Sequence, residues 1–369
     1  MGIYLCLKYY VQPGQKVICS PYTLAEVINM IVCSGGEPFF VDVERETGSL
    51  DPASLPEDSA NVAALLVTHL HGIPADMDPI LQYAGERGIP VLEDAAQSAG
   101  TRYDGRFVGT LGAAGVISSG ILKQLNSIYG GTVLTDDDEL EEFLRIQVAQ
   151  FRKAPIRVLL DKLIYLMRLH TLGRNPLFSL GLFPLLRYGV TSDVAWINRM
   201  VTVETDLQLK QKVEDWYRHR MTSSQARMLA REIDRLGEHD KSRIEHAEFY
   251  LNELSDIKGL IVPTVPPGGE ATFAHFPVQV DDAPNLLRWF NHYGQDVVCQ
   301  HFHNCAELAC FAPFSRSCPT ASQVAKSLIL LPTYPGYGTE NVKRNCKVIR
   351  RYFEKGQPSY TNQNLLEIL

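Results

Sequence analysis

The stretch VLEDAAQSAG, residues 91–100, ends an apolar run with an acid, Asp94, and follows it with Gln97 three positions later. A second stretch, SSGILKQL (118–125), places Lys123 just after the apolar run GVISS. Around both stretches, from about residue 15 to 135, short apolar runs alternate with helical segments, which predicts a mainly parallel sheet with helices on both faces. Ligands bind outside the carboxyl ends of the strands in such sheets, so we expect His69, Asp94 and Ser118 to lie near a ligand site.

The expected elements follow from this alternation and from glycines that fit helix C-caps. A long amphipathic helix is predicted from about residue 204 to 240, and the last ~130 residues predict a smaller α+β domain. We therefore expect a large domain over residues 1–240, with a hydrophobic helical insertion at about 150–200, and a small domain over 241–369. The predicted strands are KVICS, PFFVDV, VAALLVTHL, IPVLED and GVISS, and the predicted helices between them are LAEVINMIVCSG and DPILQYAGERG.

The composition limits the classes of function. With 369 residues the chain can form roughly two domains with sizeable cores. A net charge of −7 shows no basic footprint, so we expect no nucleic-acid partner. The eight cysteines include no C-x-x-C pair, and the first residues lack the pattern of a signal peptide. We expect reduced thiols and a cytoplasmic protein.

The pair Asp94 and Lys123 suits one cofactor chemistry. A lysine amine forms a Schiff base with a carbonyl, and pyridoxal phosphate exploits this reaction. Asp94 can face the pyridine nitrogen, Ala96 can lie under the ring and Gln97 can bond the ring hydroxyl. Ser118, five residues before Lys123, can reach the phosphate. Taken alone, Lys123 would be read as a solvated loop charge.

Longer motifs favour the cofactor interpretation. The motifs PYTLAEVINMIVCSGGEPFFVDV (21–43), THLHGIPADMDPI (68–80), VLEDAAQSAGTRYDGRFVGTLG (91–112), S-x4-K and GGTVLTDD (130–137) resemble the DegT/DnrJ/StrS-type sugar aminotransferases in order and spacing. The likeness implies a fold-type I pyridoxal-phosphate transferase whose site lies at a homodimer interface. It also implies that Lys123 is the Schiff-base lysine, Asp94 the pyridine partner, Gln97 the ring-hydroxyl contact and Ser118 a phosphate ligand.

Several positions depart from the family's pattern. The aromatic residue that normally stacks on the ring is replaced by Leu24, for which Tyr22 is the candidate substitute. An asparagine that reaches the partner subunit's phosphate aligns with Arg218, which suits a phosphate ligand. Gly112-Ala113 and Ser119 replace a Gly-Asp pair and a phenylalanine. The family's S-G-T-x-A-L stretch would precede Met1, so we expect either a start encoded further upstream or a lost loop, and weak cofactor binding by this form.

Two further stretches have competing interpretations. Residues 154–190 predict amphipathic helices with an exposed apolar face, which packs either on the protein's own domains or dimer partner, or on a membrane surface with its arginines at the headgroups. The stretch CQHFHNCAELAC (299–310) carries five candidate zinc ligands, but their spacing matches no common zinc site. We expect no metal, and we expect these histidines to lie in the substrate pocket or the core.

The sequence thus predicts a pyridoxal-phosphate-dependent aminotransferase that acts on a keto sugar carried on a nucleotide, with glutamate as the expected amino donor. We expect a cytoplasmic homodimer, with peripheral membrane contact through residues 154–190 as the alternative to packing of this face on the protein or its dimer partner. The alternative is a non-catalytic relative with a degraded cofactor site and a binding or regulatory role.

Overall fold

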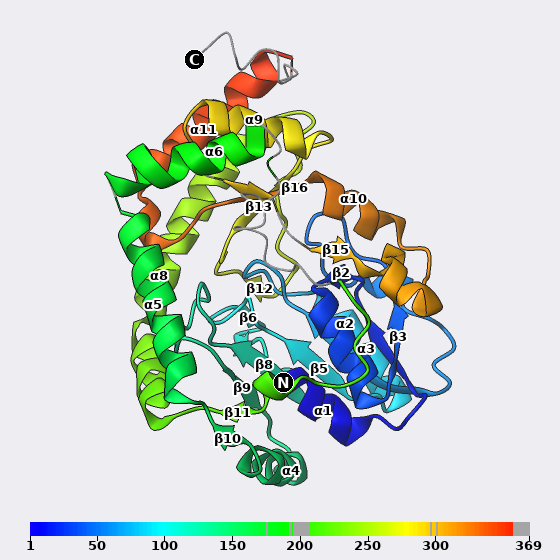
Figure 1. Ribbon diagram of the computed structural model, residues 1–369. Helices are drawn as coiled ribbons and strands as arrows, with labels where there is room; N and C mark the ends of the chain where they lie inside the picture. Colours follow the sequence, from blue (N-terminus) through cyan, green and yellow to red (C-terminus); the bar gives the residue numbers. More distant parts are fainter. Residues whose placement is uncertain (175, 192–193, 195–206, 296, 300–301, 357–369) are drawn as a thin grey trace.

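The computed structural model describes residues 1–174, 176–191, 194, 207–295, 297–299 and 302–356. A six-stranded sheet with the order β3-β1-β4-β5-β8-β9 forms its centre (Figure 1). All neighbouring pairs are parallel except β8 and β9, which are antiparallel. The fold is therefore the mainly parallel sheet that the sequence predicted. The strands are β1 Lys16–Cys19, β3 Glu37–Phe40, β4 Val62–Thr68, β5 Val91–Asp94, β8 Ala114–Ser118 and β9 Gly131–Leu134.

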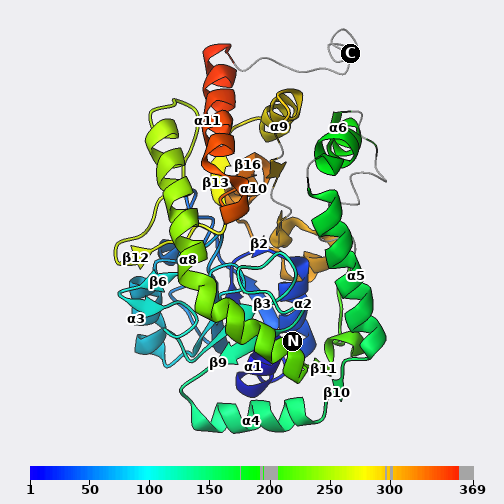
Figure 2. The same cartoon turned by 90° about the vertical axis from the view of Figure 1, so that its left-hand side faces the viewer.

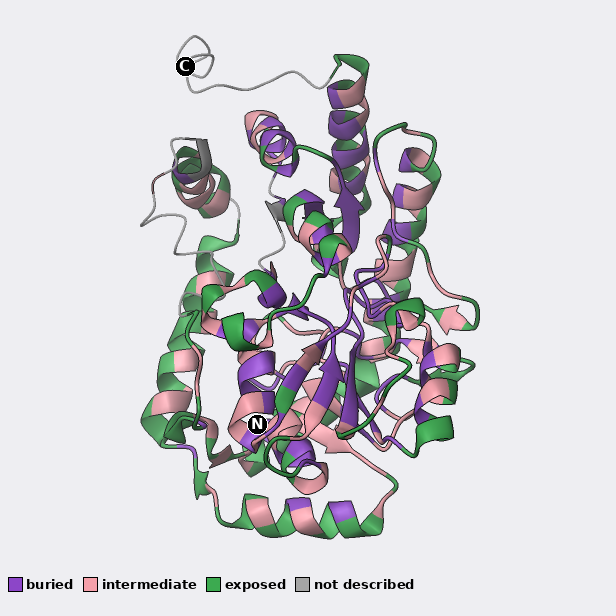
Figure 3. Cartoon of the chain, turned by 90° about the vertical axis from the view of Figure 1, so that its right-hand side faces the viewer, coloured by how far each residue is buried: buried purple, intermediate pink, exposed green. Residues whose placement is uncertain are grey.

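Helices cover both faces of this sheet, because alternate residues of each strand point to opposite sides. In β4, Ala64 and Leu66 pack in a core with α1 Gly2–Tyr10 and α2 Ala25–Ser34. Leu65 and Val67 pack instead in a second core that includes α3 Met77–Arg87. Figure 3 shows the strands between these layers as buried.

The ends of α2 and α3 are capped as the sequence predicted. Gly35 and Gly88 follow these helices with φ angles of 100° and 64°. This left-handed backbone carries no steric penalty in glycine, and it lets the cap N–H groups bond the last helical carbonyls.

The C-terminal part has a core of its own. The helix α8 Ser223–Leu254 leads into an antiparallel sheet of β13 Phe276–Gln279, β16 Leu328–Leu331 and β14 Val298–Cys299. Helices α9 Ala283–His292 and α11 Thr339–Glu354 pack with α8 and this sheet.

The predicted helix at 204–240 was wrong in its bounds. Residues 207–214 form no helix, and α8 begins at Ser223 and continues to Leu254. The reason is a capping box: the Thr222 hydroxyl accepts the Gln225 N–H, and the Gln225 side chain accepts the Thr222 N–H. These two bonds fix the N-terminus of the helix at this point.

Residues 302–324 cross back to the N-terminal core. Phe302, Cys305 and Phe311 pack in the same core as α1 and α2. The strand β15 His303–Asn304 pairs with β2 Tyr22–Thr23. This pairing places a C-terminal segment against the residues that precede α2. The division at residue 240 remains a prediction.

The other elements are β6 Arg102–Tyr103, β7 Arg106–Phe107, β10 Arg152–Lys153, β11 His219–Arg220, β12 Gly269–Glu270, α4 Asp138–Ala149, α5 Ile156–Leu172, α6 Phe183–Thr191 and α10 Pro319–Ser327.

Candidate active site

Asp94 and Lys123 lie on the same cavity. Asp94 is the last residue of β5, and Lys123 lies in the loop after β8, its parallel neighbour. Because the carboxyl ends of neighbouring parallel strands meet at one edge of the sheet, the two side chains converge. They line a cavity of about 1110 Å³ together with Ser118.

Burial tunes both groups. It lowers the pKa of the Lys123 amine, and the Asp94 carboxylate offsets this only in part. It raises the pKa of the Asp94 carboxyl, against the hydrogen bond from the Ala96 N–H and the charge of Lys123. A lysine with a lowered pKa is more often an uncharged amine, the form that attacks a carbonyl.

The residues predicted to accompany this pair lie close to it. The Ala96 N–H donates to Asp94 Oδ1 at 3.1 Å and so orients the carboxyl. Ala96 and Gln97 line a small neighbouring cavity that Asp94 and Lys123 also border. The Gln97 Oε1 accepts the backbone N–H of His71 at 3.1 Å.

Two predicted contacts lie elsewhere. Tyr22 is fully buried, with its ring centroid 5.6 Å from that of Phe302, and it lines neither cavity, whereas Leu24 lines both. The Arg218 guanidinium is half exposed, 3.8 Å from Asp215, and it also lines neither cavity. Its predicted role concerns a partner subunit.

The N-terminal end of α1 forms one wall of the large cavity. Gly2 and Ile3, in the first turn, line this cavity, as Ser118 does. A side chain at Gly2 would approach Val116 to 3.0 Å, so glycine lets the helix start sit close against β8. The first N–H groups of a helix have no partner within it and favour an anion. The cavity is therefore lined by two groups that suit a phosphate, the start of α1 and the Ser118 hydroxyl.

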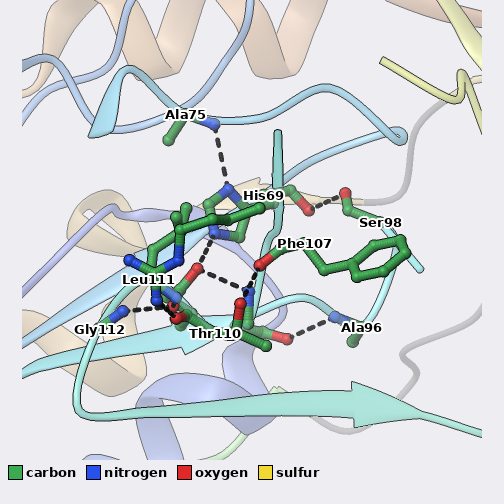
Figure 4. Close-up of polar contacts among 12 residues, drawn as sticks. His69, Ala75, Ala96, Ser98, Phe107, Thr110, Leu111 and Gly112 are labelled. Carbon is green, nitrogen blue, oxygen red and sulfur yellow. Dashed lines mark hydrogen bonds and ion pairs between the residues drawn. The ribbon is translucent and has the colours of Figure 1, made fainter. Parts of the chain in front are cut away.

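His69 and Glu93, which directly precedes Asp94 in β5, form a buried pair, and Figure 4 shows the contacts of His69. The His69 Nδ1 accepts the Ala75 N–H at 3.1 Å, so its proton sits on Nε2 and is donated to Glu93 Oε2 at 3.0 Å. Glu93 also accepts backbone N–H groups from Gly109 at 2.6 Å and from Leu111 and Gly112 at 2.7 Å. Burial alone would raise the pKa of Glu93, but these donors outweigh it and lower the pKa.

The pair fixes the surroundings of Asp94. His69 lines the small cavity, and its backbone N–H donates to the Asp94 carbonyl at 3.0 Å. Glu93 holds the 109–112 loop, whose Gly109 and Gly112 line the large cavity. We flagged His69 from the sequence but missed Glu93, although the signal was available: an acid inside a four-residue apolar strand requires buried donors.

A second link, also missed, holds the lysine loop to the C-terminal part. The Gln124 Nε2 donates to Thr272 Oγ1 at 3.1 Å, and the Thr272 hydroxyl also lies 2.9 Å from that of Thr101. Gln124 directly follows Lys123 in the chain. This chain of three side chains therefore ties the Lys123 loop to two other segments.

Two further histidines lie close to Lys123. Burial, together with the nearby His275 and Lys123, lowers the pKa of His71 to about 3. Burial likewise lowers the pKa of His275 to about 4. In the part of the chain that the structure describes, neither ring nitrogen of His71 has a hydrogen-bond partner. Both rings are neutral at pH 7.

No metal site accompanies these groups within the described ranges. No set of three His, Cys, Asp or Glu side chains there is placed to hold an ion. The predicted zinc candidates include the side chain of Cys299 and the whole of His301, which lie outside the described residues.

Comparison with known proteins identifies the family. The model of the DegT/DnrJ/EryC1/StrS aminotransferase family matches residues 2–166 and 199–350. The chain belongs to this family. Spore coat polysaccharide biosynthesis protein SpsC of Bacillus subtilis (strain 168) is 27% identical over 362 residues, which cover 95% of this chain and 82% of SpsC.

Solved structures show the same fold. The sugar aminotransferase CalS13 from Micromonospora echinospora is 22% identical with a TM-score of 0.71, covering 95% of this chain and 84% of CalS13. DesI, solved in the presence of its TDP-sugar product, is 21% identical with a TM-score of 0.69, covering 96% of this chain and 79% of DesI. This DegT/DnrJ/EryC1/StrS protein is thus a fold-type I, pyridoxal-phosphate-dependent aminotransferase.

The residues of the cavity fit that cofactor. Asp94 could hold a proton on the ring nitrogen, Lys123 could supply the amine, and the start of α1 and Ser118 could bind the phosphate. The cavity of about 1110 Å³ leaves space for a substrate beside the cofactor. Leu24 lies where the resemblance expects an aromatic ring.

Proposed function

We propose that this aminotransferase transfers an amino group to a keto sugar carried on a nucleotide, with glutamate as the donor, and that it works as a homodimer. The observation that carries the proposal is the convergence of Lys123 and Asp94 on one large cavity. The relatives support the substrate class: SpsC is named for polysaccharide biosynthesis, and DesI was solved with a TDP-sugar product.

Asp94 and Lys123 have different roles in this proposal. Pyridoxal phosphate supplies a ring that accepts electrons from the substrate carbon when a proton leaves it. The Asp94 carboxylate keeps a proton on the ring nitrogen, and its own position is set by the Ala96 N–H. Burial lowers the pKa of the Lys123 amine. Its Nζ would take the proton from the substrate carbon that bears the amino group and return it to a carbon of the cofactor.

A second subunit completes the site in this proposal. The cavity is lined by four residues around Arg218, which are Trp216, Tyr217, His219 and Arg220. Arg218 itself does not line it. Its half-exposed guanidinium can therefore extend toward another molecule. We assign Arg218 of the partner subunit to the cofactor phosphate, where its fork of donors suits the anion.

The test is a donor and acceptor screen. The purified protein is loaded with pyridoxal phosphate and given glutamate, glutamine, aspartate or alanine, each with a TDP-4-keto sugar or with the free keto sugar. We expect repeated turnover, with more than one 2-oxoglutarate formed from glutamate per enzyme, only when the nucleotide-linked sugar is present as acceptor, and none with Lys123→Ala. Turnover of the free sugar at the same rate contradicts the nucleotide link. Turnover of another donor alone contradicts glutamate. The absence of any turnover by a cofactor-loaded protein would favour the non-catalytic alternative.

A further inference from the structure

The helix α5, Ile156–Leu172, presents an apolar stripe to solvent. Five side chains share this stripe because they recur at helical spacing. Their exposed fractions lie between 42% and 70%, and no residue of the 17-residue helix is buried. Packing on the protein's own domains, one part of the first expectation for this region, therefore does not cover the stripe. Its residues are Ile156, Leu160, Leu163, Ile164 and Met167.

The opposite side of α5 faces the protein. Val158, Lys162 and Leu166 are half-buried there, and the Lys162 ammonium lies 5.6 Å from the centre of the Tyr129 ring. Figure 2 shows α5 and α6 along the edge of the molecule, away from the central sheet. The stripe thus points outward from a helix whose other side is in contact with the body.

The charge around the stripe is mostly positive, and the one acid, Asp161, lies 4.0 Å from Arg157. Residues 152–188 hold seven basic residues and one acid, Asp161, which gives this segment a net charge of +6. The whole chain has a net charge of −7, so the rest of it carries −13. Arg157 and Arg168 project beside Ile164 at the border of the stripe, because residues 157, 164 and 168 lie on neighbouring lines of the helix.

The residues after α5 continue the apolar surface and lie outside the region that the family model matches, whereas residues 156–166 of α5 lie inside it. Leu177 and Leu180 are 50% and 80% exposed. The family model leaves residues 167–198 unmatched. Neither α5 nor α6 contributes a residue to the two cavities of the active site. The catalytic chemistry therefore does not account for this surface.

We propose that α5, with the exposed Leu177 and Leu180 after it, binds the surface of a bilayer that contains anionic lipid. An apolar stripe bordered by arginines enters the boundary between headgroups and acyl chains, and the basic residues contact lipid phosphates. The segment lies on the surface, since no described helix combines the length and apolarity needed to cross a bilayer. A contact between two copies of the stripe about a twofold axis would place +6 against +6, so a second copy fits this surface less well.

The test is flotation of the full-length, cofactor-loaded protein with vesicles of phosphatidylcholine alone or with 30% phosphatidylglycerol added. We expect wild type to float with the anionic vesicles only, and less at high salt. Arg157→Gln with Arg168→Gln should weaken binding by about 30-fold, from the usual contribution of each basic residue near such a surface. Ile156→Ser with Leu160→Ser and Met167→Ser should abolish it.

The matched control is Ile146→Ser, which removes an exposed isoleucine from α4 and should float like wild type. Retained cofactor binding shows that each variant is folded. Equal recovery of wild type from anionic and neutral vesicles overturns the proposal. So does a wild type that stays in solution while the triple serine variant changes its oligomeric state by light scattering, which would assign the stripe to a second copy.

Discussion

The Nε2 of His69 lies 3.0 Å from Oε2 of Glu93, and both side chains are fully buried, Glu93 directly before Asp94 in β5. Because the Ala75 N–H occupies the other ring nitrogen, only one tautomer of His69 fits this arrangement. The carboxylate of Glu93 then has four donors and no exposed oxygen. The backbone position of Asp94 thus depends on the buried carboxylate of Glu93, which precedes it in β5.

We expect Glu93→Gln to destabilise the protein by on the order of 3 kcal/mol, because an amide NH₂ replaces one acceptor oxygen and leaves buried N–H groups without a partner. Urea unfolding at pH 7 measures this. The control Glu86→Gln changes an exposed acid beside Arg87 and should stay within about 0.5 kcal/mol of wild type. Equal stability of the two variants contradicts the role assigned to Glu93.

The stability difference between wild type and Glu93→Gln should depend on pH. The pKa of Glu93 is lowered in the folded protein from an ordinary value of 4.5. Its contribution is therefore present above that value and is lost as the pH falls through the folded pKa. The two unfolding curves should approach each other in acid, and a difference that grows in acid would contradict the lowered pKa.

Protonation of His71 should lower the stability of the protein at a higher pH than protonation of Glu93 does. Its pKa falls from 6.5 to about 3 on folding, so its contribution is present above 6.5 and is lost as the pH falls toward the folded value. Wild type should lose up to about 1.4 kcal/mol per pH unit more than His71→Asn below pH 6.5. Asparagine tolerates the positive φ of 59° at this position. Urea unfolding at pH 7, 6 and 5 measures the slopes, with the exposed His170→Asn on α5 as the control, which should keep the wild-type slope.

Asp94→Asn should keep the cofactor but lower kcat by about 10²–10³-fold, because an amide does not hold the ring nitrogen protonated. Steady-state kinetics at saturating pyridoxal phosphate separate this from a loss of binding. The exposed Asp58→Asn serves as the control and should be fully active. An Asp94→Asn enzyme with wild-type kcat would remove Asp94 from the chemistry.

Leu24→Tyr should tighten cofactor binding by about 2- to 12-fold, because an aromatic ring at this cavity position can stack on the cofactor. Fluorescence titration with pyridoxal phosphate measures the affinity. Tyr22→Leu removes the ring of a core residue outside both cavities, so it should leave the affinity of the folded protein unchanged. A weaker affinity for Tyr22→Leu would instead support the substitute role that the sequence suggested for Tyr22.

The sequence predicted the part of the site that strand ends determine. Asp94 and Lys123 follow two apolar strands, and parallel pairing of those strands brings such residues together. The position of Tyr22 could not be predicted this way. It depends on the pairing of β2 with β15, residues about 280 positions apart, which turns Tyr22 toward Phe302 and the core.

Other features depend on contacts that a linear pattern does not show. The bond between Gln124 and Thr272 joins segments 148 positions apart. The amphipathic pattern before residue 223 favoured a longer helix, but the two reciprocal bonds of Thr222 and Gln225 decided where α8 begins. In both cases the outcome was set by specific hydrogen bonds and not by hydrophobic periodicity.

The most direct test of the account identifies the lysine that holds the cofactor. Wild type is incubated with pyridoxal phosphate, reduced with borohydride, digested and analysed by peptide mass spectrometry, beside Lys123→Ala and the exposed-lysine control Lys8→Ala. We predict that the cofactor is fixed to the peptide that contains Lys123 in wild type and in Lys8→Ala, and that Lys123→Ala carries none. Cofactor fixed to a different lysine, or equal labelling of Lys123→Ala, would contradict the active site described above.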